Sequence, residues 1–173
     1  MKIVYSVFFT LVGLAAFGLI FIYTGWFNVS AMNQDTGITK WVLNNIRENS
    51  IDSRVKDIKV PNLEDSSLIK IGFSHYKEMC QGCHNAPGFE ETDLAKGLNP
   101  SAPDLVKYGD KIPPEELFWV TKNGIRMTGM PAWGKTHPDS KIWAIVAAVR
   151  KLSSTSAEIY DTYSKEKDED ETE

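Results

Sequence analysis

The sequence of 173 residues predicts an all-α fold with one N-terminal transmembrane helix. Residues 3–27 contain no charged side chain, which is typical of a membrane-spanning segment. In the later segments, apolar residues recur at intervals of three and four, as on one face of a helix, and do not alternate as in a strand. Proline and glycine mark the breaks between these segments. The length suits one domain of ordinary size with additional segments.

The N-terminal apolar run is long enough to cross a membrane, because a helix of about 20 apolar residues spans a hydrocarbon core of about 30 Å. Aromatic residues gather at its far end, where they favour the membrane interface. A cleaved signal peptide is the alternative, since residues 29–31 (Val-Ser-Ala) resemble a cleavage site. The run exceeds the roughly 7–15-residue core of such peptides, and only Lys2 precedes it. We therefore predict an uncleaved membrane anchor over residues 1–30.

Residues 31–66 connect the anchor to the next domain and contain a predicted amphipathic helix from about Thr39 to Lys56. Its apolar residues lie at approximately helical spacing, with polar and charged residues between them. They are Ile38, Trp41, Val42, Ile46, Ile51, Val55 and Ile58. We expect this helix to pack on its own domain, with the membrane surface and a partner subunit as alternatives. Pro61 favours an end to the helix before it.

A second amphipathic helix is predicted from Leu68 to about Cys80, after serines that can cap its N-terminus. Gly72, Phe73 and Tyr76 fall on one face, which we expect to be buried. His75 falls on the other side beside charged residues, so we expect a surface histidine.

The rest of the domain is predicted to be loops followed by two helices. Residues 85–112 are rich in proline, glycine and acidic residues and should form loops with one short helical turn. Residues 113–116 (Pro-Pro-Glu-Glu) suit the first turn of a helix, which residues 123–124 (Asn-Gly) should end. Apolar residues at helical spacing predict the last helix over residues 139–152.

The charge of the chain is unevenly distributed. Residues 68–152 carry 11 basic and 9 acidic residues, whereas residues 153–173 carry 2 basic and 8 acidic residues. The acidic C-terminal segment has little apolar content, so we predict a disordered tail over residues 153–173. Because no dense stripe of Lys and Arg is present, the charge distribution does not indicate a nucleic-acid binder, and we expect no nucleic-acid partner.

Cys80, Cys83 and His84 have the Cys-x-x-Cys-His spacing of covalent haem attachment. In this motif both thiols add to haem vinyl groups and the imidazole binds iron. A zinc site would need two further ligands, and only His75 and His137 are available. A thioredoxin-like pair would need a βαβ context, and a structural disulfide would leave the adjacent histidine unexplained. One haem, bound through this motif, is therefore the prediction.

Residues 129–134 (Gly-Met-Pro-Ala-Trp-Gly) offer a second iron ligand in Met130. Its thioether would raise the reduction potential relative to two histidines and close the iron to other ligands. Met127 is the competing methionine, to which we assign a packing role. His137 is the alternative for two-histidine ligation, and its neighbour Pro138 favours a surface or capping role.

Together the Cys-x-x-Cys-His motif and the methionine loop resemble those of the class I cytochromes c, over residues 67–152. The resemblance implies helices packed around one covalently bound haem c. It also implies that Cys80 and Cys83 form the thioether links, that His84 is the proximal ligand and that Met130 is the distal ligand.

Two further features follow from the same resemblance. Residues 103–105 (Pro-Asp-Leu) resemble the family's Pro-Asn-Leu element, whose proline carbonyl accepts a hydrogen bond from the second N–H of the proximal histidine. The resemblance therefore implies that the Pro103 carbonyl accepts from His84, with Pro100 and Pro87 as substitutes. In the family the helix before the haem motif crosses the last helix at a small residue. Gly72 fits this description, and its expected partners are Ile142, Trp143 and Val146.

The resemblance implies one-electron transfer and no enzymatic activity on a small-molecule substrate. In bacteria, haem is attached to such proteins outside the cytoplasmic membrane, so the haem domain is expected on the periplasmic side of that membrane. The expected partners are a quinol-oxidising complex as donor and a terminal oxidase or reductase as acceptor. Lys122, Arg126 and Lys135, around the methionine loop, are expected to meet an acidic partner surface. The alternatives are a permanent haem subunit of a larger respiratory complex and a haem-based sensor or peroxidase.

Overall fold

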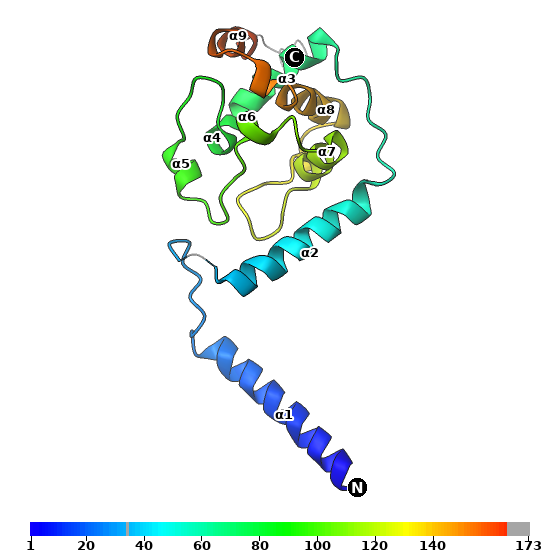
Figure 1. Ribbon diagram of the computed structural model, residues 1–173, viewed down its shortest axis with the longest axis vertical. Helices are drawn as coiled ribbons and strands as arrows, with labels where there is room; N and C mark the ends of the chain where they lie inside the picture. The colour runs from blue at the N-terminus through cyan, green and yellow to red at the C-terminus, as the bar shows by residue number, and fades with distance from the viewer. Residues whose placement is uncertain (34, 166–173) are drawn as a thin grey trace. The chain divides into compact units, whose positions relative to one another are not determined.

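The computed structural model describes residues 1–33 and 35–165, and every regular element in these ranges is a helix (Figure 1). The all-α prediction is therefore confirmed. The chain divides into two compact units, one ending at residue 34 and one beginning at Asp35.

The first unit contains helix α1, Lys2–Tyr23, which is 22 residues long. Its mean hydropathy is 2.3, and no part of it is buried within the structure. A helix of this length and composition is compatible with a single-pass membrane anchor. Within the described residues, α1 is the one helix that meets both conditions.

The second unit begins with helix α2, Gly37–Val55, close to the predicted range. The Thr36 side chain caps it by accepting a hydrogen bond from the Thr39 backbone N–H. Ile51 is buried, and the helix contacts α7, Pro114–Asn123. The helix therefore packs on its own domain, as the sequence analysis expected.

The core forms where helix α3, Ser66–Met79, crosses helix α8, Asp139–Val149. A Cβ atom on Gly72 would lie 1.9 Å from the Ala144 carbonyl oxygen and 2.9 Å from the Ala148 Cβ. Only glycine allows this approach. The predicted partners belong to the core or pack against it, but the two alanines of α8 are the residues that face Gly72.

His75 is not a surface residue, so its predicted position was wrong. It is 2% exposed, and its ring packs edge to face on His137 with 6.1 Å between the ring centroids. The segment leading into α8 covers this side of α3. The amphipathic pattern identified one buried face of α3 and missed this second one.

Shorter helices complete the domain around the haem motif. Residues 85–112 contain two short helices, α5 and α6, where one helical turn was expected. The last predicted helix ends at Val149, three residues earlier than expected, and a 3₁₀ turn follows it. The elements are α4, Gln81–His84; α5, Asp93–Lys96; α6, Leu105–Tyr108; and the 3₁₀ turns η1, Trp133–Lys135, and η2, Leu152–Ser154.

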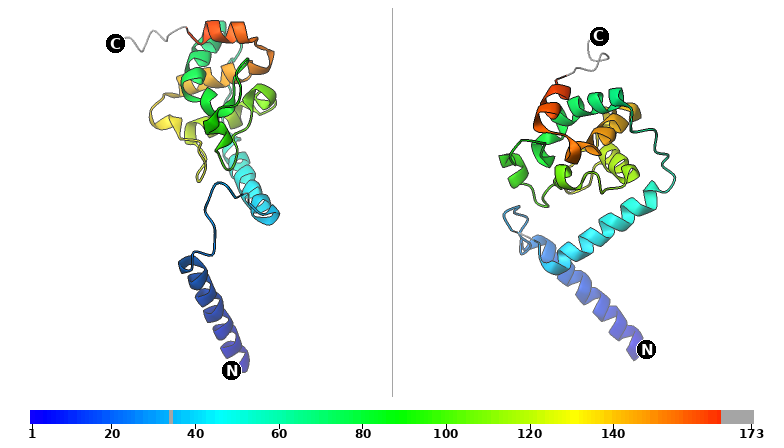
Figure 2. Two further views of the ribbon diagram at one scale, coloured as in Figure 1. Left: turned by 90° about the vertical axis from the view of Figure 1, so that its left-hand side faces the viewer. Right: turned by 45° about the horizontal axis from the view of Figure 1, so that its top comes forward.

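Part of the predicted tail is ordered. Residues 157–163 form helix α9, Ala157–Tyr163, which lies beside α3 (Figure 2). Tyr160 is fully buried against Phe73 and Tyr76, and its hydroxyl donates a hydrogen bond to the Gln81 side chain at 2.7 Å. Tyr160, together with the partly buried Tyr163 on Phe73, therefore anchors a segment whose overall composition is acidic. Residues 166–173 of the predicted tail lie outside the described residues.

Candidate functional site

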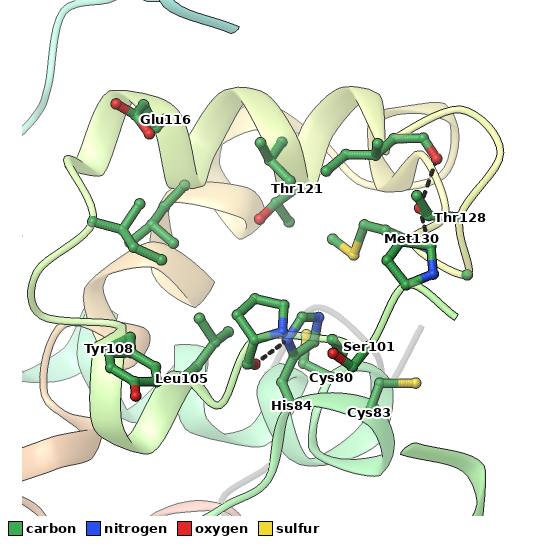
Figure 3. Close-up of a pocket in the computed structure, with 18 of the residues that line it drawn as sticks. Cys80, Cys83, His84, Ser101, Leu105, Tyr108, Glu116, Thr121, Thr128 and Met130 are labelled. Atoms are coloured by element: carbon green, nitrogen blue, oxygen red, sulfur yellow. Dashed lines mark hydrogen bonds between the residues drawn. The ribbon is translucent and has the colours of Figure 1, made fainter. Parts of the chain in front are cut away.

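A cavity of about 660 Å³ opens between α4, α6, α7 and the loop after α7 (Figure 3). This volume is within the roughly 300–1,000 Å³ range of cofactor sites. All five predicted site residues line it: Cys80, Cys83, His84, Pro103 and Met130. Segments far apart in the sequence thus bring the two candidate motifs to one site.

The Cys-x-x-Cys-His motif forms one helical turn. The backbone N–H groups of Cys83 and His84 donate to the Cys80 carbonyl oxygen at 3.1 and 3.0 Å. Residues at i, i+3 and i+4 share a helix face, so this turn directs both thiols and the imidazole toward the cavity. Burial, together with the neighbouring Cys83, raises the pKa of the Cys80 thiol to about 12.

A structural zinc site would need further ligands beside the two thiols and His84. In the described part of the chain, no group of three or more His, Cys, Asp or Glu side chains is placed to hold a metal ion. Addition of each thiol to a vinyl group remains the chemistry that the motif supports.

His84 is held by the Pro103 carbonyl oxygen, which lies 2.9 Å from its Nδ1 atom. The carbonyl can only accept, so this contact assigns the proton to Nδ1 and leaves the Nε2 lone pair for a metal. Burial lowers the pKa of His84 by more than the hydrogen bond to Pro103 raises it. The imidazole is therefore neutral at pH 7, which is the form that coordinates metals.

Two residues that the sequence analysis did not assign to the site fix the backbone around His84. The Tyr76 hydroxyl donates to the carbonyl oxygens of His84 and Asn85 at 3.2 and 2.7 Å. The Asp104 carboxylate caps α6 by accepting from the backbone N–H groups of Val106 and Lys107. An aspartate before Leu105 could have identified this cap, whereas nothing in the sequence indicates the Tyr76 contacts.

The Asp104 carboxylate has a shifted pKa. Burial pushes this pKa upward, but hydrogen bonds from the Asn85 side chain and from Lys107, together with the Lys107 charge, leave it below its ordinary value. The carboxylate is therefore charged at neutral pH.

Met130 lies on the opposite wall of the cavity from His84 (Figure 3). The Thr128 hydroxyl accepts from the Met130 backbone N–H at 3.1 Å and donates to the Ile125 carbonyl at 2.7 Å. Gly124 has a φ of 65°, and a Cβ atom there would lie 2.8 Å from the Met130 carbonyl oxygen. The loop is thus folded tightly on both sides of the methionine.

The two competing ligands lie elsewhere. Met127 is 90% exposed, so its predicted packing role was wrong. The His137 ring lies 2.8 Å from the Thr136 hydroxyl and does not line the cavity. Met130 is thus the residue opposite His84 that offers a soft donor.

The remaining walls of the cavity are mostly apolar, with side chains from α6, α7 and the loops. They include Leu98, Leu105, Ile112, Leu117, Val120, Ile125 and Trp133. Two thiols, one neutral imidazole, one thioether and apolar walls are the donors and surfaces that a haem c requires. The residues present therefore fit this group.

Helix α2 also contributes to the cavity, which the sequence analysis did not predict. Arg47, Glu48, Ile51 and Asp52 line it, and Glu116 of α7 is a further lining residue. Burial and then the negative charges of Asp52, Glu115 and Glu48 raise the pKa of Glu116. These acidic groups are therefore close to one another at one part of the cavity.

Comparison with known proteins places one segment of the chain in a family. Residues 67–147 match the family model described as cytochrome C oxidase, cbb3-type, subunit III. No curated protein matches the chain.

Proposed function

Since residues 67–147 form a monohaem class I cytochrome c domain, which binds one covalent haem c and carries electrons, we propose His84 and Met130 as the two residues that would bind its iron. The observation that carries this proposal is the arrangement of the cavity. The His84 Nδ1 atom lies 2.9 Å from the Pro103 carbonyl oxygen, and Met130 faces His84 from the other wall.

Each residue has a defined task in this proposal. Cys80 and Cys83 hold the group through thioether bonds, and Pro103 keeps the His84 Nε2 lone pair oriented toward iron. Met130 would supply the second protein ligand and so close the iron to exogenous ligands. The haem supplies one-electron chemistry when bound, and the apolar walls exclude water from it.

The test is an absorption spectrum of the oxidised full-length protein. Ferric haem with His and Met ligands has a near-infrared charge-transfer band from sulfur to iron. We expect the wild type to show this band and Met130→Ala to lose it. Met127→Ala is the matched control, because Met127 belongs to the same loop and is 90% exposed. A high-spin wild-type spectrum that changes on addition of carbon monoxide would contradict the ligation and favour the sensor or peroxidase alternative.

We further propose that α1 tethers the domain to the outer face of a bacterial cytoplasmic membrane. Its length of 22 residues and its mean hydropathy of 2.3 support the tether, and covalent haem attachment supports the periplasmic side. The electrons would come from a quinol-oxidising complex and pass to a terminal oxidase or reductase. Fractionation of membranes tests the tether, and protease treatment of intact spheroplasts tests the periplasmic side, because a periplasmic domain is cleaved without lysis.

The matched family description names an oxidase subunit, which favours a second arrangement. In it, the chain is a permanent haem subunit of a terminal oxidase. Solubilisation in mild detergent and native electrophoresis with haem staining distinguish the two. A permanent subunit migrates with a large complex, whereas a tethered carrier migrates alone.

A further inference from the structure

Helix α2 lies outside the residues that match the family model, yet it forms part of the haem cavity. Its four lining residues, Arg47, Glu48, Ile51 and Asp52, occur at i, i+1, i+4 and i+5, which is one face of a helix. Ile51 is only 9% exposed, whereas Ile46 is 61% exposed. The buried face of α2 is therefore the face toward the cavity.

The electrostatic neighbours of Glu116 indicate which part of the cavity this face closes. Helix α2 contacts α7, and the charges of its Asp52 and Glu48 both act on Glu116, so this face of α2 lies near the start of α7. Figure 3 shows Glu116 and Tyr108 on the side of the cavity away from Cys83. Helix α2 thus closes the end of the cavity remote from that thiol.

The chemistry of haem determines what this end must accommodate. The two vinyl groups and the two propionate carboxylates lie on opposite sides of the macrocycle. If Cys80 and Cys83 hold the vinyl side, the carboxylates extend toward the remote end. Two carboxylates that leave bulk water need a cation or hydrogen-bond donors.

Arg47 is the only permanently cationic side chain among the described residues that line the cavity. The other charged lining groups are acidic: Glu48, Asp52, Asp104 and Glu116. A guanidinium group matches a carboxylate with two parallel hydrogen bonds. Arg47 forms an ion pair with its neighbour Glu48 at 3.4 Å, and the two side chains are 38% and 64% exposed. Such exposed pairs are weak, so this contact does not prevent a second one.

We propose that Arg47 is the counter-ion of the haem carboxylates and that α2 is the wall that closes this edge of the haem. The inference rests on the proposed haem attachment in this cavity. Ferric haem carries one more positive charge than ferrous haem, so a neighbouring cation favours the ferrous form. Arg47 therefore raises the reduction potential.

The experiment is redox equilibration of the full-length haem protein in detergent against a mediator of known potential. We expect Arg47→Gln to lower the equilibrium constant for reduction at least threefold, which corresponds to about 28 mV at 59 mV per tenfold change. Arg47→Lys should recover most of this loss. The matched control is Arg54→Gln, which removes the same charge from the same helix. Arg54 donates to the Ser50 carbonyl and does not line the cavity. Because salt screens such a surface charge, its replacement should leave the equilibrium constant for reduction within about 1.5-fold of the wild-type value.

Equal constants for Arg47→Gln and Arg54→Gln would overturn the proposal. If Arg47→Gln fails to retain haem, the haem content of Arg47→Lys and Arg54→Gln decides. We expect both of these variants to keep haem, and loss of haem from Arg54→Gln as well would overturn the proposal. Failure of His/Met ligation is seen separately, in the near-infrared spectrum of the wild type.

Discussion

Replacing Gly72 with alanine tests the close crossing of α3 and α8. The new Cβ atom would lie 1.9 Å from the Ala144 carbonyl oxygen, whereas real Cβ atoms keep at least 3.0 Å from other heavy atoms. The helices must therefore move apart by about 1 Å, because a backbone carbonyl cannot rotate away as a side chain can. This movement separates the buried side chains on both helices, including Phe73 and Ile145.

The expected cost can be estimated from two opposing effects. Overpacking of a core costs roughly 1–3 kcal/mol and occasionally more, and a rigid obstacle places Gly72→Ala at the upper end. Alanine recovers about 1 kcal/mol of helix propensity. We therefore expect the free energy of unfolding to fall by about 2 kcal/mol or more.

Guanidinium unfolding of the full-length haem protein, followed by circular dichroism and by haem absorbance, measures this change. Gly97→Ala is the control, because its Cβ atom would lie 3.5 Å from the nearest atoms, an ordinary contact. We expect a change within about 0.5 kcal/mol for this control. A Gly72→Ala protein that unfolds at the same denaturant concentration as Gly97→Ala would refute the reasoning.

Two further predictions concern charged residues. Asp104→Ala should lower the free energy of unfolding by about 1 kcal/mol at pH 7, because it removes the cap of α6. Folding lowers the pKa of Asp104, so its charged carboxylate stabilises the protein at pH values above the ordinary pKa of 3.8. This stability is lost as the pH falls through the lowered pKa. The difference between variant and wild type should therefore shrink in unfolding curves below pH 4, and a constant difference would contradict this assignment. Reversing the charges of Arg126 and Lys135 together should slow electron transfer to an acidic redox protein and weaken the salt dependence of that rate in stopped-flow measurements. Lys122 stays unchanged in this variant because it is already paired with Asp139 at 2.7 Å. Unchanged rates and salt dependence would remove this surface as a docking site.

The helices were predictable where one apolar face faces the core. The ranges of α2, α3 and α7 agree with the sequence pattern to within about two residues, because caps and prolines mark their ends. The pattern does not say how many sides of a helix are covered. His75 was therefore misplaced, and the alanines opposite Gly72 were not identified, since small residues give no strong periodic signal.

The acidic C-terminal segment shows a second limit of the sequence. Average composition correctly describes a segment with little apolar content, but Tyr160 alone contributes a fully buried ring. That ring contacts three aromatic side chains from other parts of the chain, Phe73, Tyr76 and Phe89. Composition averages over such a residue, so disorder was predicted where α9 packs.

The candidate site combines a local part with a non-local part, and only the first follows from a motif. Cys80, Cys83 and His84 share one helical turn, so their relation is fixed by spacing. The cavity end lined by Arg47 and Glu116 depends on contact between two helices, α2 and α7, that are far apart in sequence. No local pattern specifies that contact. Attachment of haem can therefore be inferred from the sequence, whereas the charges that tune its potential require the fold.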